Sequence, residues 1–346
     1  MAVNCFWTNL VRMVQECETL LPARVYVTYE KPAEFGTTPT LAAIGPDGSL
    51  LVEGPEQEPS NVVDADPVSG SFYMLVTQYA APETLFKYDI DLNVEWSVSL
   101  EEVSGEPFTT TRDYFVMQVN YSGKPVYVVP SSSPSVAVFN EDGSLESHND
   151  ISSFIGNVNS QVRIASDNTL IIASRSKIIR VSSDGSVLLN TYFSSTDDVF
   201  NVDVDEDINV YMTIGQFGSG GETSKLDKQG NLLNTFNTQN ARHVRHVDGS
   251  GNIFALNENT RTVTKYDVNG DFLWSKDFAD GELPDSTAER EVFKVERDGY
   301  SYVIWADSTG SEDVFHITRL APDGSEVWDR SDINGSSGMA TFGGGG

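Results

Sequence analysis

Short stretches of alternating apolar and polar residues, each closed by a tight-turn signal, recur along most of the chain. Clear examples are TSKLDKQGNLLNTF (223–236) and TVTKYDVNGDFLWSKDF (262–278). A period of two places apolar side chains on one face of a strand, and glycine accepts the positive φ that tight turns require. The pattern therefore predicts antiparallel hairpins.

The hairpin recurs seven times, with 40–54 residues between successive turns. Two further short strands precede each complete hairpin, as in HVRHVDG and NIFALNE before residue 262. Four antiparallel strands per unit at this period are typical of a β-propeller blade. We therefore predict an all-β fold, a seven-bladed β-propeller of four-stranded antiparallel blades over residues 24–342. The turn residues are Gly48, Leu92, Gly143, Gly185, Gly230, Gly270 and Gly324.

The two ends of the chain have separate predictions. Apolar residues at i, i+4, i+7 and i+11 from Leu10 predict one short amphipathic helix within residues 1–23. The first blade has three strands in residues 24–54, so Met339–Phe342 is expected to complete it and close the ring without an open edge. Residues 343–346 are expected to form a flexible glycine tail.

The repeat also has a family resemblance. The sequences around Asp205–Leu232 and Asp248–Trp274, each with an inner turn followed by K-L-D-x-x-G-N-L or K-Y-D-V-N-G-D-F, resemble bacterial seven-bladed propeller repeats. They are also similar to quinoprotein-like and NHL-type repeats. The resemblance covers nearly the whole chain after residue 24 and implies the blades alone, because these families include enzymes, binding modules and surface structures.

Charge restricts the partners. The 346 residues include 22 Lys+Arg and 51 Asp+Glu, a formal net charge of −29. A nucleic-acid backbone requires clustered cations, so nucleic acid is not an expected partner. No apolar run is long enough to span a bilayer, and Arg12, Glu16 and Glu18 rule out a signal-peptide core. Cys5 and Cys17 are too few for a disulfide-stapled fold.

Two side-chain types recur with the blades. A cation stands five positions before the turn residue in five copies, and we expect it to cover a strand and pair with a neighbouring acid rather than form a functional ring of charge. Tryptophan stands four positions after the turn in three copies, where it favours inter-blade packing. These residues are Lys87, Arg180, Lys225, Lys265 and Arg319, with Trp96, Trp274 and Trp328.

The candidate ligand-binding site is a ring of polar residues at equivalent positions of the innermost strands. Its charges are mixed, so a mutually paired channel lining is the preferred interpretation, with a small-ligand site as the alternative. The ring comprises Asp64, Gln118, Arg163, Asp203, His246 and Lys294.

Catalytic and metal signatures are weak. His243 and His246 are three apart on a predicted strand and would point to opposite faces, so they are not expected to share a metal. Residues 203–207 and 89–93 begin like calcium-binding EF-hand loops but lack the required sixth-position glycine and twelfth-position glutamate. We expect no catalytic set, metal or cofactor, although a looser calcium site stays open.

Function is therefore expected to lie in recognition, since loops on a stiff scaffold commonly carry it. Longer connections at 101–113 and 279–290 would project from one face. The leading hypothesis is a non-enzymatic structural component of a bacteriophage-like virion, at the tail or capsid surface, with other proteins of the assembly or a host-surface glycan or protein as partners. The alternatives are a soluble ligand- or glycan-binding module, cytoplasmic in location, and a quinoprotein- or lyase-type enzyme.

Overall fold

The structure is a computed structural model, and it describes most of the chain beyond residue 24. The described residues are 25–33, 36–56, 60–66, 69–76, 84–100, 116–129, 134–155, 162–174, 177–192, 198–215, 222–236, 244–257, 260–278, 281–282, 293–307, 314–331 and 341–343. The predicted N-terminal helix, both cysteines, His243 and most of the two long connections lie outside them. Among the described residues, no helix combines the length and the apolar character needed to cross a membrane.

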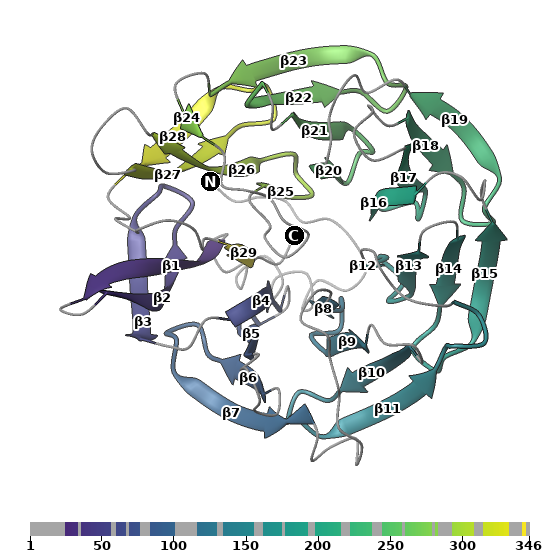
Figure 1. Cartoon of the computed structure of the whole chain (residues 1–346), viewed down its shortest axis with the longest axis horizontal. Helices are drawn as coiled ribbons and strands as arrows, with labels where there is room; N and C mark the ends of the chain where they lie inside the picture. The colour runs from purple at the N-terminus through teal and green to yellow at the C-terminus, as the bar shows by residue number, and fades with distance from the viewer. Residues whose placement is uncertain are drawn as a thin grey trace, which may run out of the picture.

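The described strands form antiparallel sheets arranged around a central axis, as Figure 1 shows. We number them blades 1–7. Blade 1 contains β1 (Val25–Ala33), β2 (Gly36–Ile44), β3 (Leu50–Glu56) and β29 (Thr341–Gly343). Blade 2 contains β4 (Ser60–Ala65), β5 (Phe72–Val76), β6 (Thr84–Tyr88) and β7 (Val94–Ser99), and blade 3 contains β8 (Val116–Val119), β9 (Pro125–Val129), β10 (Ser135–Phe139) and β11 (Leu145–Asp150). Blade 4 contains β12 (Val162–Ile164), β13 (Leu170–Ser174), β14 (Lys177–Val181) and β15 (Val187–Tyr192).

The later blades follow the same plan. Blade 5 contains β16 (Asp198–Val204), β17 (Val210–Gly215), β18 (Glu222–Leu226) and β19 (Leu232–Phe236). Blade 6 contains β20 (Val244–Val247), β21 (Ile253–Asn257), β22 (Thr262–Tyr266) and β23 (Phe272–Asp277). Blade 7 contains β24 (Gly281–Glu282), β25 (Phe293–Val295), β26 (Ser301–Asp307), β27 (Val314–Leu320) and β28 (Glu326–Arg330). The all-β propeller of four-stranded antiparallel blades is therefore confirmed in its main features, and blade 7 departs from it because β24 and β25 both pair with β26.

The predicted count of seven blades needs a correction. Among the described strands, six blades, not seven, are formed from consecutive strands. The sheet at the start of the chain has three consecutive strands and takes its innermost one, β29, from the end of the chain, where Phe342 pairs with Val27. The strand also extends to Gly343, which pairs with Tyr26, so this residue belongs to a sheet rather than to the predicted tail.

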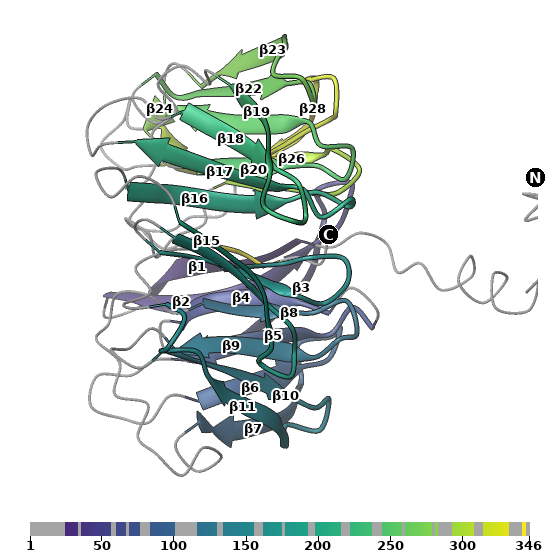
Figure 2. The same ribbon diagram turned by 90° about the vertical axis from the view of Figure 1, so that its right-hand side faces the viewer.

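Two sets of turns, those between the first and second strands and those between the third and fourth, lie on the same side of the disc. Because neighbouring strands are antiparallel, the turn between the first and second strands and the turn between the third and fourth lie at the same end of the sheet. Figure 2, an edge-on view, shows these turns gathered along the right-hand side. We call this side the turn face and the opposite side the loop face.

The outer turns explain the recurring glycine. In blade 3 the amide of Gly143 donates to the carbonyl of Asn140, and a register shift follows in the strand pair. This is a type I turn closed by a residue in the left-handed conformation. Gly143 has φ 83° and Leu92, which replaces glycine in blade 2, has φ 66°. The predicted positive φ at the turn residue is thus confirmed.

The predicted packing role of the tryptophans is also confirmed. Trp274 lies against Gly324 of the next blade, where a Cβ on that glycine would come within 2.7 Å of the indole, and its Nε1–H donates to the carbonyl of Pro322 at 2.9 Å. Trp96 and Trp328 make the equivalent contacts to the turns containing Gly143 and Gly48. Glycine is therefore needed at these turns both for its φ and for the close approach of the preceding blade.

Candidate functional site

The six predicted ring residues all lie on innermost strands. They come from β4, β8, β12, β16, β20 and β25, one from each, so the sequence alignment of the blades placed them correctly. Four of them form ion pairs with one another and His246 lies beside one of the carboxylates, as described below, whereas the uncharged Gln118 is half-buried on β8. We call this set the central ring: Asp64, Gln118, Arg163, Asp203, His246 and Lys294.

Asp203 connects three blades. Its carboxylate lies 3.5 Å from Nε of Arg163 on the preceding blade and 3.5 Å from Nδ1 of His246 on the following one. It also accepts a hydrogen bond of 2.8 Å from the amide of Val247. Burial acts to raise the pKa of Asp203, but the imidazole of His246 and the charge of Arg163 outweigh it and hold that pKa below its ordinary 3.8.

Asp64 repeats part of this arrangement on blade 2. It accepts a 2.7 Å hydrogen bond from the amide of Val119 on blade 3, as Asp203 accepts one from Val247. Lys294 lies 3.8 Å from the Asp64 carboxylate, although the blade that contains β29 separates their two strands in the ring. Two aspartates therefore join neighbouring inner strands, and two cations match their charge.

Side chains of the inner turns meet above the axis on the turn face. The guanidinium of Arg297 on blade 7 lies 4.1 Å from the ring centre of Tyr121 on blade 3, and 3.5 Å from the Glu206 carboxylate on blade 5. The amide of Gly249 on blade 6 donates to the carbonyl of Arg297. Burial lowers the pKa of Arg297. Turns of four blades are thereby tied together across this end of the axis.

One buried nitrogen of the central ring, in His246, differs from the other polar atoms in its hydrogen bonding. Nε2 of His246 is buried and has no hydrogen-bond partner among the described residues, whereas Nδ1 faces Asp203. The imidazole also packs edge-on against Phe293, with 5.6 Å between ring centres. A buried nitrogen without a partner is costly and commonly marks a place for water or a ligand. This atom is the strongest feature in favour of the small-ligand alternative.

A second histidine–aspartate pair lies on blade 7 and was not predicted. Nδ1 of His316 is 2.7 Å from the Asp329 carboxylate, which also accepts from the hydroxyl of Thr318, and the indole of Trp305 stacks on the imidazole at 3.9 Å. Trp305 donates to Thr318 as well. Thr318 lies opposite Asp329 because a bulge beside the Gly324 turn shifts the strand register by one residue. The pair can be found by counting residues from the turn only if that bulge is known.

The five recurring cations have the predicted structural role. Lys225 lies 3.8 Å from Asp205, Lys265 lies 3.5 Å from Asp248, and each cation also covers an aromatic ring of the second strand. The others pair in the same way within their own blades. These pairs are Arg180 with Asp167, Arg319 with Glu296 and Lys87 with Glu95.

Blade 3 shows that these side chains vary together. Val138 occupies the position of the cation, and it pairs across the strands with Val126 at the position of the aromatic residue. Asn120 occupies the position that is Asp66, Asp205 or Asp248 in other blades. Where the cation is absent, the turn acid is an amide, as expected if a buried carboxylate needs a counter-charge.

The two motifs that resemble the start of a calcium loop are used internally. The Asp205 carboxylate accepts hydrogen bonds from the backbone and side-chain amides of Asn209 and from Tyr211, while Asp203 belongs to the central ring. Asp89 accepts from Asn93 in the same way. Within the described residues no group of three potential metal ligands gathers.

Comparisons with known proteins agree on the fold. No family model matches the chain, and no curated protein matches its sequence. A streptogramin B lyase structure is 13% identical, with a TM-score of 0.55, covering 81% of this chain and 94% of that one. KlHsv2 with loop 6CD replaced by a Gly-Ser linker is 10% identical, with a TM-score of 0.56 and coverages of 86% and 94%.

A third neighbour is the dihydro-heme d1 dehydrogenase NirN in complex with DHE. It is 12% identical, with a TM-score of 0.55, covering 92% of this chain and 74% of that one. The three neighbours are named for different roles and share the propeller. Similarity at these identities extends to the fold and leaves the function to be argued from this chain's own residues.

Proposed function

We propose that the chain is a non-enzymatic interaction protein, a rigid propeller that binds another protein. The observation that carries this proposal is on the outermost strands of blades 4, 5 and 6, where large apolar side chains lie exposed. Leu232 is 62% exposed and Phe272 is 63% exposed. Adjacent exposed apolar side chains of this size are typical of interaction sites.

The central ring supports the same function. Its charged side chains form pairs that join different blades, so they contribute to the rigidity of the disc rather than presenting a set of unlike groups to a substrate. A rigid scaffold lowers the cost of binding because little conformational freedom is lost.

A place in a virion is the narrower form of this proposal. It rests on the amino-acid composition of the chain. None of the three neighbours named above is named as a virion protein. Binding of a partner or glycan through the connections at 101–113 and 279–290 is a second narrower form, and nearly all of those residues lie outside the described part of the chain.

The test is reconstitution. A protein that co-purifies with the chain from its native source would be identified, produced separately and mixed with the purified chain. We expect a stoichiometric complex in size-exclusion chromatography with light scattering. A chain with residues 102–113 replaced by a Gly-Ser linker reports on the loop face. Recovery of the chain as a free monomer from every native extract would contradict the proposal.

His246 favours a second candidate, a small-ligand site in the central ring. Its partnerless Nε2 could accept a hydrogen bond from a ligand hydroxyl or amide. A thermal-shift screen of glycans and of quinones with calcium tests this candidate and the enzyme alternative together. A shift that His246→Phe abolishes would favour it over the interaction function, whereas a flat screen would remove it.

A further inference from the structure

The outer edge of blades 4–6 has an unusual composition. Each outermost strand begins two residues after the turn residue, and in these blades its first two residues are both apolar. The exposed members, together with one turn residue, are here called the apolar rim. They are Leu188 (55% exposed), Leu232 (62%), Leu233 (53%), Val268 (37%), Phe272 (63%) and Leu273 (49%).

Inter-blade contacts make this rim continuous. The side-chain amide of Asn234 on β19 donates to the carbonyl of Asn269 in the turn of blade 6 at 3.5 Å, and Phe236 packs on Gly270 of that turn. A bulge places Leu232 opposite Leu226 and Asn234 opposite Lys225, so Leu232 and Asn234 face opposite sides of β19. The link from blade 5 to blade 6 runs instead through Phe272, whose ring lies 6.5 Å from that of Tyr266, and Tyr266 packs against the cluster that contains Phe236. The exposed side chains of blade 6 therefore connect to blade 5.

The same geometry holds on either side. Leu189 and Thr191 of blade 4 lie against Gly230 of blade 5, and Trp274 of blade 6 lies against Gly324 of blade 7. Phe272 lies opposite Tyr266 and Trp274 lies opposite Lys265, so the bulge puts Phe272 on the other face, toward blade 5. The apolar rim thus follows three consecutive blades at the edge of the turn face.

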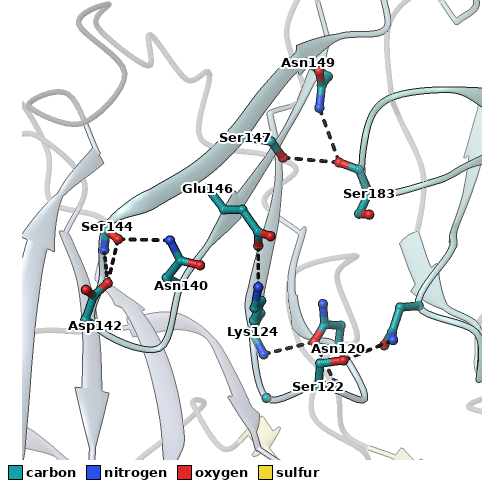
Figure 3. A network of polar contacts seen from close by, with 12 residues as sticks. Asn120, Ser122, Lys124, Asn140, Asp142, Ser144, Glu146, Ser147, Asn149 and Ser183 are labelled. Carbon is teal, nitrogen blue, oxygen red and sulfur yellow. Dashed lines mark hydrogen bonds and ion pairs between the residues drawn. The ribbon is translucent and has the colours of Figure 1, made fainter.

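Blades 2, 3 and 7 have a glutamate at one of the two equivalent positions, whereas blade 1 has Leu50 and Leu51. Blade 3 has Glu146, whose carboxylate is 2.8 Å from Nζ of Lys124 within a network of polar contacts (Figure 3). Blade 2 has Glu95 paired with Lys87, and blade 7 has Glu326 paired with Lys276. A repeat that accepts a paired glutamate here does not require leucine or phenylalanine for its fold. The apolar choice in blades 4–6 therefore needs another reason.

The turns beside the apolar rim are negatively charged. Residues 182–188, 227–233 and 267–273 contain four aspartates and one lysine, Lys228. Hydrogen bonds from serine hydroxyls and backbone amides lower the pKa of Asp184 to about 2, and the turn amides similarly lower the pKa values of Asp227 and Asp267. These carboxylates stay ionised at any physiological pH, so the apolar rim has an anionic border.

We propose that the apolar rim docks a cationic amphipathic segment of a partner protein, one that offers apolar side chains flanked by lysine or arginine. Charge complementarity selects this occupant. A second copy of the chain would bring another net charge of −29 to the same place, and an anionic membrane would be repelled. The chain's own residues 1–24 contain two arginines and two glutamates and have no excess of cations. This proposal rests on the interaction function above and names its site and partner chemistry.

The test uses the full-length chain and a fluorescein-labelled 15-residue peptide of leucine and lysine, with leucines at helical i, i+3, i+4 and i+7 spacing. The rim variant is Leu232→Ser with Phe272→Ser. The matched control is Leu50→Ser with Leu51→Ser, which removes two apolar residues of 44% and 42% exposure from the first two positions of the outermost strand of blade 1, between two blades with paired glutamates. Circular dichroism and thermal melts would show that both variants fold.

We expect fluorescence anisotropy to show at least tenfold weaker peptide binding to the rim variant and less than a twofold change for the control. Hydrogen exchange should slow at residues 227–233 and 267–273 on binding. Equal losses in both variants, or no loss in the rim variant, would overturn the proposal, because non-specific attraction to an acidic protein would then account for binding. Phe272-dependent dimerisation in sedimentation velocity, or Phe272-dependent binding to phosphatidylcholine vesicles, would overturn it in favour of a second copy or a membrane.

Failure here is distinguishable from failure of the interaction function. If a reconstituted partner binds the wild-type chain and the rim variant equally, the docking site is wrong and the interaction function stands. If that partner is lost only with the 102–113 replacement, the loop face holds the site instead.

Discussion

The centre and the rim of this propeller reverse the usual distribution of polarity. At the centre, ionisable side chains such as Asp203 and Arg163 are mostly buried and paired across blades. At the rim of blades 4–6, leucine and phenylalanine side chains are 49–63% exposed. The centre thus stabilises the disc with groups that ordinarily face water, while the rim exposes groups that ordinarily form a core.

The difference shows which region tolerates substitution without loss of stability. Each ionised group at the centre needs a partner on another blade, so one change leaves a buried charge uncompensated. At the rim, blade 3 has the Lys124–Glu146 pair where blade 5 has leucine, and both blades adopt the same four-stranded sheet. Substitutions at the centre should therefore affect stability, and those at the rim should affect binding.

The largest effect is expected at the centre. Asp203→Ala removes the acceptor of the Val247 amide and leaves Arg163 without its partner, so we expect the free energy of unfolding to fall by about 3 kcal/mol. Chemical denaturation measures it. The matched control is Asp184→Ala in an exposed turn, which should leave the midpoint almost unchanged. Equal effects in the two variants would break the contrast between buried and exposed aspartates.

The next effect concerns the junction between blades. Gly324→Ala places a Cβ 2.7 Å from the Trp274 indole at φ 83°, so we expect a loss of about 2–3 kcal/mol. Combining it with Trp274→Ala should relieve the steric part and leave about 1 kcal/mol of backbone strain. Additive effects in this double-mutant cycle would mean that the glycine is needed for its φ alone.

A smaller effect tests the covariation seen in blade 3. Lys265→Val in blade 6 leaves the buried Asp248 without its cation and should cost about 2 kcal/mol. Adding Asp248→Asn reproduces the Val138 and Asn120 combination of blade 3 and should recover part of that loss. If the double variant were less stable than Lys265→Val, the need of a buried carboxylate for a cation would not explain why blade 3 has Val138 together with Asn120.

The pH dependence follows from the same buried carboxylate. The pKa of Asp203 is lower in the folded chain than in the unfolded chain, so the unfolded state binds the proton first as the pH falls. The stability that Asp203 contributes is complete above about pH 4 and is lost as the pH falls through the folded pKa. Asp203→Asn should flatten the dependence of unfolding free energy on pH below that point, measured at low protein concentration. An unchanged slope would contradict the lowered pKa.

The smallest stability effect is expected at the apolar rim. Leu232→Ser with Phe272→Ser should change the unfolding free energy by no more than about 0.5 kcal/mol per site, because both side chains are mostly exposed. Chemical denaturation of this variant and of Asp203→Ala under the same conditions compares their free energies of unfolding. A loss comparable to that variant's would mean that the rim is part of the core, and the contrast between centre and rim would fail.

Much of the fold could be predicted from the chain. The period of the hairpin located the turn residues, and alignment of the blades put six polar residues on innermost strands. The packing role of Trp274 and the pairing of Lys265 with an acid followed from their repeat positions. These features are local or repeat with the blade, so one strand pattern constrains them.

Contacts between distant blades could not be predicted in that way. The Lys294–Asp64 pair and the Arg297–Tyr121 contact cross the axis between residues that no repeat brings together. The His316–Asp329 pair depends on a turn bulge that shifts the register by one residue. The exposed rim was missed because leucine after a turn glycine resembles an ordinary core position until the neighbouring blade is in place.

The sequence by itself determined the strand pattern, the blade period, the positive-φ turns and the strong negative charge, because each depends on residues close together in the chain. Only the tertiary structure decided which charges compensate one another at the centre and which apolar side chains remain exposed. Ring closure sets the distances between blades, and those distances determine whether a carboxylate meets its cation and whether a leucine is covered.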